Sequence, residues 1–300
     1  MSGKNVSGIL APIHQKKDVE DESDRTYPQM GMSPFSLLTL KGGYYPHFTS
    51  WSKTREKIDL ENQIFTSITT PKQKKVQIIV EITIITKPFI LNVSVNCYLI
   101  RTSNGFILID TGRPKKRNAI EKELESADCH PGDLKLIILT HGDFDHCGNA
   151  AYFRKKFGAQ IAMHKADSGM VEHGNMLWNR RKRNILTRMV FKLLFRLGKS
   201  DRFKPDLFFD EGYDFSEYGF DAKALEIPGH SKGSIGILAT SGELFCGDLL
   251  ANIGKPDLWS IIDDSDVAHA SVEKLKSLQI NTVFPGHGQP FPMELFLKTH

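Results

Sequence analysis

The sequence predicts an α/β protein, because apolar runs of strand length alternate with helix-like segments over most of the chain. In addition, five of the apolar runs each end in a small polar cluster, as strands do when they deliver side chains to one edge of a sheet. Hydrophobic residues make up 40% of the 300 residues and charged residues 25%, which is the ordinary composition of a folded domain.

The strands and helices are expected in a regular order from Lys75 onward. Residues 76–85 form a β-branched run, and residues 95–110 predict a hairpin that turns at Ser103-Asn104-Gly105. Further strands are expected at 135–140, 160–164, 222–229, 235–240, 243–248 and 281–286, and helices at Lys115–Ser126, Asn149–Phe157 and 267–278.

The amino-terminal quarter has a different composition. Residues 1–30 are polar and charged and predict a disordered tail, residues 31–75 form an extension to which we assign no structure, and residues 76–300 form the folded domain. We expect neither a signal peptide nor a run of roughly 20 apolar residues that could span a bilayer. The four cysteines form no CxxC pair, so we expect reduced thiols and a soluble, cytoplasmic protein.

The net charge of +4 is unevenly distributed, because the segment Arg180–Lys204 contains ten Lys or Arg residues and one acid. At helical spacing its basic stripe consists of Arg188, Lys192, Arg196 and Lys199. We interpret it as a basic helical lid inserted at about residues 176–204. Such a helix could contact an anionic membrane surface, hold a lipid-like substrate, or be an ordinary surface helix, and nucleic acid is the less favoured partner.

The polar clusters at the strand ends consist of one chemical type. They contain Asp110, then His141-Gly142-Asp143-Phe144-Asp145-His146, and then His230, Asp248 and His287. Imidazole and carboxylate groups suit zinc, manganese and iron(II), and two ions about 3.5 Å apart need roughly seven such ligands with a bridging carboxylate. If residues 141–146 are extended, alternate side chains converge on one metal and His146 turns to the other.

Each of these residues alone has an ordinary explanation, as a buried structural histidine or as an aspartate in a turn. Together they resemble the metallo-β-lactamase superfamily over about residues 76–291, in the family's order. The resemblance implies a four-layer αβ/βα sandwich with two divalent metal ions. It also implies a first metal on His141, Asp143 and His230, a second on Asp145, His146 and His287, and a bridge through Asp248.

The resemblance also gives Asp110 a role, which is to orient the site by accepting a hydrogen bond. Asp145 and Asp110 are the two carboxylates that we expect to take part in catalysis. The chain departs from the usual pattern at Asp143, where the family has a histidine. Zinc is the ordinary metal of such sites, but the harder and negatively charged Asp143 favours manganese or iron.

The expected activity is hydrolysis of an ester, thioester, lactone or phosphodiester bond by a hydroxide that bridges the two metals, in a small-molecule or lipid-like substrate. Only 13 residues follow His287, which leaves no room for the helical domain that glyoxalase II-like thioesterases use to bind glutathione. Two other classes remain open: a diiron redox protein that handles oxygen or NO, and a basic protein that binds membranes or nucleic acid. The sequence does not indicate an oligomeric state.

The departure at Asp143 gives a testable prediction. Replacing Asp143 by histidine is expected to keep the fold and to shift metal preference from manganese or iron toward zinc, because a softer imidazole replaces a hard carboxylate. Activity of the wild type and the variant, each reconstituted with the three metals in turn, measures the shift. Equal relative activities in both proteins would contradict it.

Overall fold

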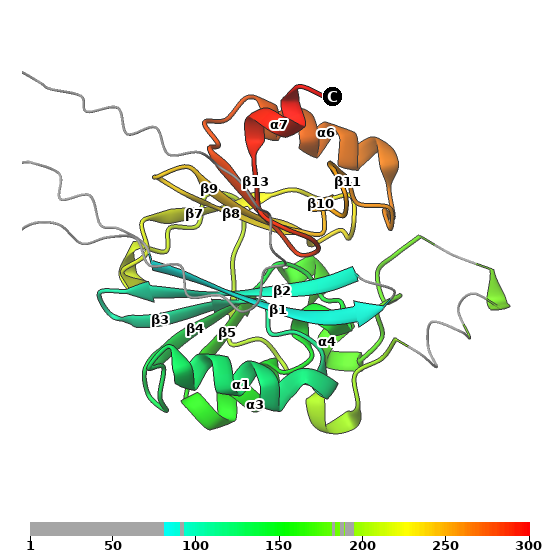
Figure 1. Ribbon diagram of the computed structural model, residues 1–300. Helices are drawn as coiled ribbons and strands as arrows, with labels where there is room; N and C mark the ends of the chain where they lie inside the picture. The colour runs from blue at the N-terminus through cyan, green and yellow to red at the C-terminus, as the bar shows by residue number, and fades with distance from the viewer. Residues whose placement is uncertain (1–80, 91–92, 182–183, 187–188, 190–194) are drawn as a thin grey trace, which may run out of the picture. The chain divides into compact units, whose positions relative to one another are not determined.

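The computed structural model describes residues 81–90, 93–181, 184–186, 189 and 195–300 (Figure 1). The expected tail at 1–30 and the extension at 31–75 lie outside these residues. Arg188 and Lys192 of the expected basic stripe lie outside them as well.

The first sheet contains six strands, which follow one another in chain order. β1, β2 and β3 are antiparallel neighbours, and β4, β5 and β6 continue parallel to β3. Their bounds are Glu81–Ile90, Val93–Thr102, Gly105–Ile109, Leu134–Leu139, Gln160–Met163 and Leu207–Phe208. The predicted hairpin is confirmed: Thr102 pairs with Gly105, whose φ of +123° favours glycine.

The second sheet has the order β13-β12-β9-β8-β7. β12 is parallel to β9, and the other neighbours are antiparallel. The bounds are Ala222–Glu226 for β7, Ile235–Ala239 for β8, Glu243–Gly247 for β9, Thr282–Pro285 for β12 and Phe291–Pro292 for β13. A separate two-stranded ribbon joins β10 (Leu250–Asn252) to β11 (Pro256–Leu258).

Helices cover the outer face of each sheet (Figure 1). The first sheet carries α1, α3 and α4, and the second carries α6 and α7, with α2 at the end of β4. Their bounds are Arg117–Ser126, Phe144–Cys147, Ala150–Phe157, Ser168–His173, Ser265–Lys276 and Met293–Leu297 for α1, α2, α3, α4, α6 and α7. Short 3₁₀ turns occupy Pro114–Lys116, Lys165–Asp167, Lys199–Asp201 and Ser216–Tyr218.

Three apolar clusters hold these layers together. The central one lies between the sheets and contains Tyr98, Ile138 and Phe245. A second cluster packs α1 and α3 against the first sheet, and a third packs α6 and α7 against the second sheet. The order of layers is therefore helix, sheet, sheet, helix, and the expected four-layer α/β sandwich is confirmed.

The two ends of residues 175–196 lie side by side. Asn175 and Arg196 form an isolated antiparallel bridge, and Leu197 beside it is buried. Between them Ile185, Leu186 and Met189 are exposed. None of the described helices is long and apolar enough to cross a membrane.

One buried side chain ties the first sheet to the loop that follows β12. Asn96 on β2 donates from Nδ2 to the carbonyls of Pro285 and Gly288, at 2.9 and 2.7 Å, and its backbone N–H donates to Gly286 at 2.9 Å. The Tyr98 hydroxyl also donates to Pro285, at 2.5 Å. Both side chains are buried, so these hydrogen bonds hold the loop from inside the fold.

We expect Asn96→Ala to lower the free energy of unfolding by about 2 kcal/mol or more, because the Gly288 carbonyl loses its side-chain donor and the Pro285 carbonyl keeps only the Tyr98 hydroxyl. Urea unfolding of the metal-free protein measures the loss. Asn281→Ala is the matched control, since Asn281 makes one exposed hydrogen bond to the Ser241 carbonyl and should change stability by about 0.5 kcal/mol or less. Equal losses in the two variants would refute the assignment.

Candidate metal centre

The strand directions place all seven expected ligand residues at one end of the two sheets. β3 and β4 are parallel in the first sheet, and β7, β9 and β12 point the same way in the second. The residues follow the ends of these strands. Their exposed fractions are 5% or less for His141, Asp143, Asp145, His146, His230, Asp248 and His287.

The HGDFDH motif is not extended throughout. Asp143 is extended, with φ −73° and ψ 144°, but α2 begins at Phe144, and the N–H groups of His146 and Cys147 both donate to the Asp143 carbonyl. The expectation of an extended loop is therefore wrong from Phe144 onward. A helical turn instead brings the neighbours Asp145 and His146 onto one group of ligand atoms.

The first group of ligand atoms comes from His141, Asp143 and His230, which all lie within 4.8 Å of one another. Asp143 Oδ2 is 3.1 Å from His230 Nε2 and 3.7 Å from His141 Nε2. The second group comes from Asp145, His146 and His287. There Asp145 Oδ2 is 3.8 Å from His287 Nε2.

Asp248 lies between the two groups. Its Oδ2 is 3.1 Å from His287 Nε2 and 3.8 Å from Nε2 of both His141 and His230, and its Oδ1 is 3.3 Å from His146 Nε2. The loop allows this approach because residue 286 is glycine: a Cβ there would lie 2.2 Å from Asp248 Oδ1. The carboxylate is therefore within reach of both groups.

The backbone fixes the orientation of two of the histidine rings. Nδ1 of His230 lies 2.5 Å from the Ile261 carbonyl, and Nδ1 of His287 lies 2.7 Å from the Ser94 carbonyl. A carbonyl oxygen only accepts, so both Nδ1 atoms carry the hydrogen. In the neutral ring the lone pair is then on Nε2, the atom that faces the site.

Asp110 and Thr140 orient the other two rings. The Thr140 hydroxyl donates to Asp110 Oδ2 at 2.8 Å, so its oxygen must accept from His141 Nδ1 at 3.0 Å. His146 Nδ1 lies 2.8 Å from the same Asp110 oxygen. Asp110 has a φ of +58°, a strained conformation that these bonds and the Thr140 N–H hold in place.

Three buried atoms of the expected ligand residues lack hydrogen-bond partners in the described part of the chain. They are His141 Nε2, His146 Nε2 and Asp248 Oδ1. The last two face each other at 3.3 Å, and without a proton on His146 Nε2 each atom presents a lone pair. A buried acceptor pair without a donor is costly, and a cation between the two atoms relieves it. The donor set and its geometry therefore fit divalent metal ions.

The ionisation of the site follows from the same contacts. Burial would lower the pKa of His146, but Asp248 and Asp110 outweigh it and raise this pKa well above its ordinary value. Burial would raise the pKa of Asp248, but His287 and His146 hold it well below its usual range. Burial dominates at Asp145 and raises its pKa. The carboxylates thus favour protonation of His146 and His287, two rings that would also coordinate a metal.

A further buried carboxylate, Asp167, joins the two principal loops. Its Oδ2 accepts from the Gly142 N–H and the Ser231 hydroxyl, at 3.1 and 2.6 Å, and its Oδ1 accepts from the Gly233 N–H at 2.9 Å. The sequence analysis missed this residue. It lies outside every metal motif, in a 3₁₀ turn after β5.

Arg180 is the second residue that the sequence analysis missed as part of the site. Its side chain is 2% exposed, and its Nη2 donates to Asp143 Oδ1 at 2.8 Å and lies 3.1 Å from His230 Nε2. Burial would raise the pKa of Asp143, but the Arg180 guanidinium outweighs it and holds this pKa below its usual value. The sequence suggested only a surface cation at the start of the basic segment.

An aromatic side chain packs on one of the ligand rings. The Trp259 indole stacks on the His287 ring, with centroids 4.6 Å apart and planes inclined by 16°. Its backbone N–H donates to Leu249, next to Asp248. Trp259 therefore supports the face of His287 and supplies an apolar surface near the ligands.

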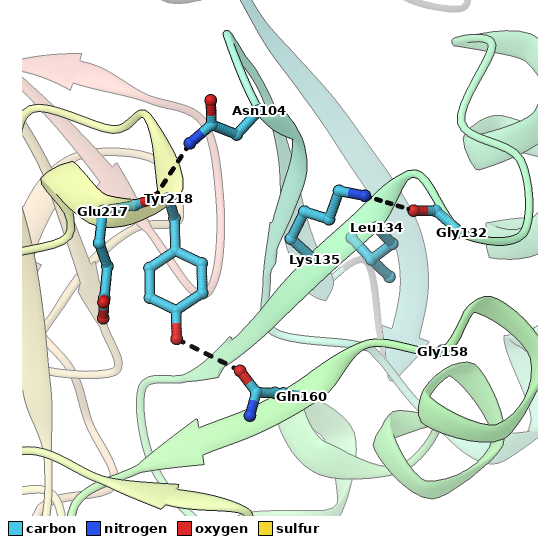
Figure 2. Close-up of a pocket in the computed structure, with 8 residues that line it drawn as sticks. All are labelled: Asn104, Gly132, Leu134, Lys135, Gly158, Gln160, Glu217 and Tyr218. Atoms are coloured by element: carbon cyan, nitrogen blue, oxygen red, sulfur yellow. Dashed lines mark hydrogen bonds between the residues drawn. The ribbon is translucent and has the colours of Figure 1, made fainter. Parts of the chain in front are cut away.

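A pocket of about 420 Å³ lies away from this centre (Figure 2). It is bordered by Asn104 in the hairpin turn and by the first residues of β4 and β5. These strand starts are at the opposite edge of the sheet from the strand ends that carry the site. Its Lys135, Tyr218 and Asn104 side chains are hydrogen-bonded to other pocket residues, so we assign no chemistry to it.

Comparisons with known proteins agree with this geometry. Residues 91–287 match the metallo-beta-lactamase superfamily. Hydroxyacylglutathione hydrolase GloC of Haemophilus influenzae is 28% identical over 207 residues, which are 64% of this chain and 85% of that protein. Human metallo-beta-lactamase domain-containing protein 1 is 26% identical over 196 residues, and the chain spans only 60% of its length.

A solved structure shows the same fold. The crystal structure of TTHA1623 in a di-iron-bound form superposes with a TM-score of 0.56 at 24% identity, and the match covers 72% of this chain and 98% of that one. The family match spans about two thirds of the sequence and includes all seven side chains of the metal centre. The chain belongs to the metallo-β-lactamase superfamily.

Proposed function

We propose that the protein is a dinuclear metal-dependent hydrolase that cleaves an ester, thioester, lactone or phosphodiester bond. The observation that carries this proposal is the set of buried, unpartnered acceptors: His141 Nε2, His146 Nε2 and Asp248 Oδ1. Nothing in the described part of the chain satisfies these atoms, and divalent cations would. Membership of the superfamily supports metal binding and hydrolysis as the broad activity.

The seven expected ligand residues would form two metal sites. His141, Asp143 and His230 would hold one ion, Asp145, His146 and His287 the other, and Asp248 would bridge them. Bound divalent ions lower the pKa of a coordinated water and stabilise negative charge on the substrate oxygen. The fixed Nδ1 bonds keep every Nε2 lone pair turned inward, so little reorganisation is needed when substrate binds.

Asp145 and Asp110 remain our candidates for catalytic carboxylates. Burial raises the pKa of Asp145, so this carboxylate accepts a proton more readily than its neighbours. Asp110 accepts from Thr140 and lies 2.8 Å from His146 Nδ1, and in this position it would act by holding the His146 ring.

The identity of the metal is part of the proposal. Zinc suits the four imidazoles, and the carboxylate at Asp143 favours manganese or iron. The di-iron-bound TTHA1623 is similar to this chain in fold, which makes iron worth testing beside zinc.

Thioesters are the first bonds to test. The Haemophilus influenzae relative is named as a hydroxyacylglutathione hydrolase, and the match covers 85% of it. The absence of a long segment after His287 therefore does not exclude a glutathione thioester.

Neither alternative class gains support from the site. The diiron redox alternative was inferred from the carboxylate of Asp143. Arg180 already balances the negative charge of this carboxylate, so the charge is no argument for redox chemistry. The membrane alternative rests on the basic segment, yet Arg180 is buried against Asp143 and Arg181 pairs with Asp264. We therefore place hydrolysis of a small-molecule or lipid-like substrate first, with membrane contact as a secondary proposal.

The decisive experiment combines metal analysis with a substrate screen. Protein expressed with added zinc, manganese or iron is expected to contain about two metal equivalents and to hydrolyse at least one of a hydroxyacylglutathione, an ester, a lactone and a phosphodiester. Asp248→Ala should lose metal, and its rate should fall about a hundredfold or more. Asp266→Ala, an exposed aspartate in α6, is the control that should change neither.

Two results would overturn the proposal. One is a folded wild-type protein that is active without metal. The other is a fully metal-loaded protein that is inactive on all four substrate classes.

Metal affinity should also depend on pH. Because Asp248 and Asp110 raise the pKa of His146, and Asp248 raises that of His287, both rings keep protons to higher pH in the metal-free protein. These protons must leave before Nε2 can coordinate, so affinity for Zn²⁺ should increase from about pH 6 to about pH 8, by up to about tenfold per unit for each displaced proton. Competition with a chromophoric chelator measures this slope. A flat profile would contradict it, and His269→Gln, far from these motifs in α6, should keep the wild-type slope.

A further inference from the structure

Arg180 contacts atoms of the first ligand group, the one formed by His141, Asp143 and His230. Its Nη2 is 2.8 Å from Asp143 Oδ1 and 3.1 Å from His230 Nε2. A guanidinium has no acceptor, so it donates to the lone pair of His230. Because Nδ1 of His230 is fixed on the Ile261 carbonyl, this is the lone pair that a metal would need.

In the second group, His146 Nε2 and Asp248 Oδ1 have no hydrogen-bond partner among the described residues. In the first group, a permanent cation lies against both Asp143 and His230. This contact gives the first group a competitor for its ligand atoms.

The position of Arg180 is fixed by the same loop that orients His230. The backbone N–H of the next residue, Arg181, donates to both oxygens of Asp263, at 3.2 and 3.0 Å, and the Arg181 side chain pairs with Asp264. The N–H groups of Asp263 and Asp264 in turn donate to the Gly229 carbonyl, at 2.9 Å each. Arg180 and His230 are thus held by one short stretch of chain.

The positive charge of Arg180 also balances the negative charge of Asp143, which stands where the family has a histidine. Where a neutral histidine would add no charge, Asp143 adds one negative charge, and Arg180 cancels it. Both side chains are buried, so each needs the other when no metal is bound.

We propose that Arg180 is the internal counter-cation of Asp143, and that it makes the two metal sites unequal. The group of Asp145, His146, His287 and Asp248 takes a divalent ion first. The group of His141, Asp143 and His230 takes one only when the guanidinium gives up His230. This inference rests on the metal-binding part of the proposed function and does not depend on the substrate. Arg180 is a positioning residue, because it acts through Asp143 and His230.

The test is a titration of metal-stripped protein with Zn²⁺ against a chromophoric chelator. The wild type should bind two equivalents in two steps whose dissociation constants differ by about tenfold or more. Arg180→Met should strengthen the weaker step by about tenfold or more and leave the tighter step nearly unchanged, because a cation a few ångströms from the incoming ion is removed. Arg154→Met is the matched control, since its side chain pairs with Asp206 at the surface and not with a ligand.

A double variant covers the case in which Arg180→Met fails to fold. Asp143→His with Arg180→Met removes both buried charges together, and it should bind two equivalents with similar affinities. Asp143→His alone leaves Arg180 buried without its carboxylate, so comparison of the single and double variants shows whether Arg180 opposes the shift toward zinc expected for Asp143→His. Circular dichroism and thermal unfolding of each metal-free variant show whether it is folded.

The outcomes separate this inference from the proposed function. Equal steps in the wild type, or an unchanged weaker step in folded Arg180→Met or in the double variant, would overturn the role of Arg180 while leaving a dinuclear hydrolase in place. No binding of Zn²⁺ by any of the proteins would overturn both.

Discussion

The structure depends on the balance of negative charge that is buried at one end of the two sheets. Five carboxylates lie there at 5% exposure or less: Asp110, Asp143, Asp145, Asp167 and Asp248. An isolated buried carboxylate is very costly, so each needs its own compensation. Asp110 and Asp167 are satisfied by N–H and hydroxyl donors, and Asp143 by Arg180. Only Asp145 and Asp248 depend mainly on imidazoles, and these are the carboxylates that a metal ion would help most.

The scaffold keeps the buried carboxylates near their partners through hydrogen bonds to the loops that surround the site. Asn96 and Tyr98 on β2 bind the carbonyls of the loop that carries His287. Asp167 joins the Gly142 loop to the Ser231 loop, so the ligands from the first sheet keep their position relative to those from the second. These contacts reach the site from residues that no metal motif contains. The ligand residues are therefore held in place by these surrounding residues, and a substitution of one of them acts on the ligands indirectly.

Much of the fold was predictable because its signals are local. Apolar alternation and the Asn-Gly turn gave the strands and the hairpin of β2 and β3, and the ligand types at strand ends gave the seven-residue set. The helical turn at Phe144 was not predictable, because four residues are too short for a periodic pattern. Asp167 and Arg180 were missed for a different reason: each acts through a contact with residues distant in the sequence, and neither carries a motif of its own.

The bridge between Asn175 and Arg196 has a consequence for how such a protein can diversify. The intervening chain starts and ends at one point of the domain, so a change in its length costs little conformational entropy, about 0.6 kcal/mol per doubling. Arg180 lies near the start of this stretch and is buried against Asp143. A change in chain length after Arg181 would therefore leave this buried ion pair, and with it the charge balance of the metal centre, in place.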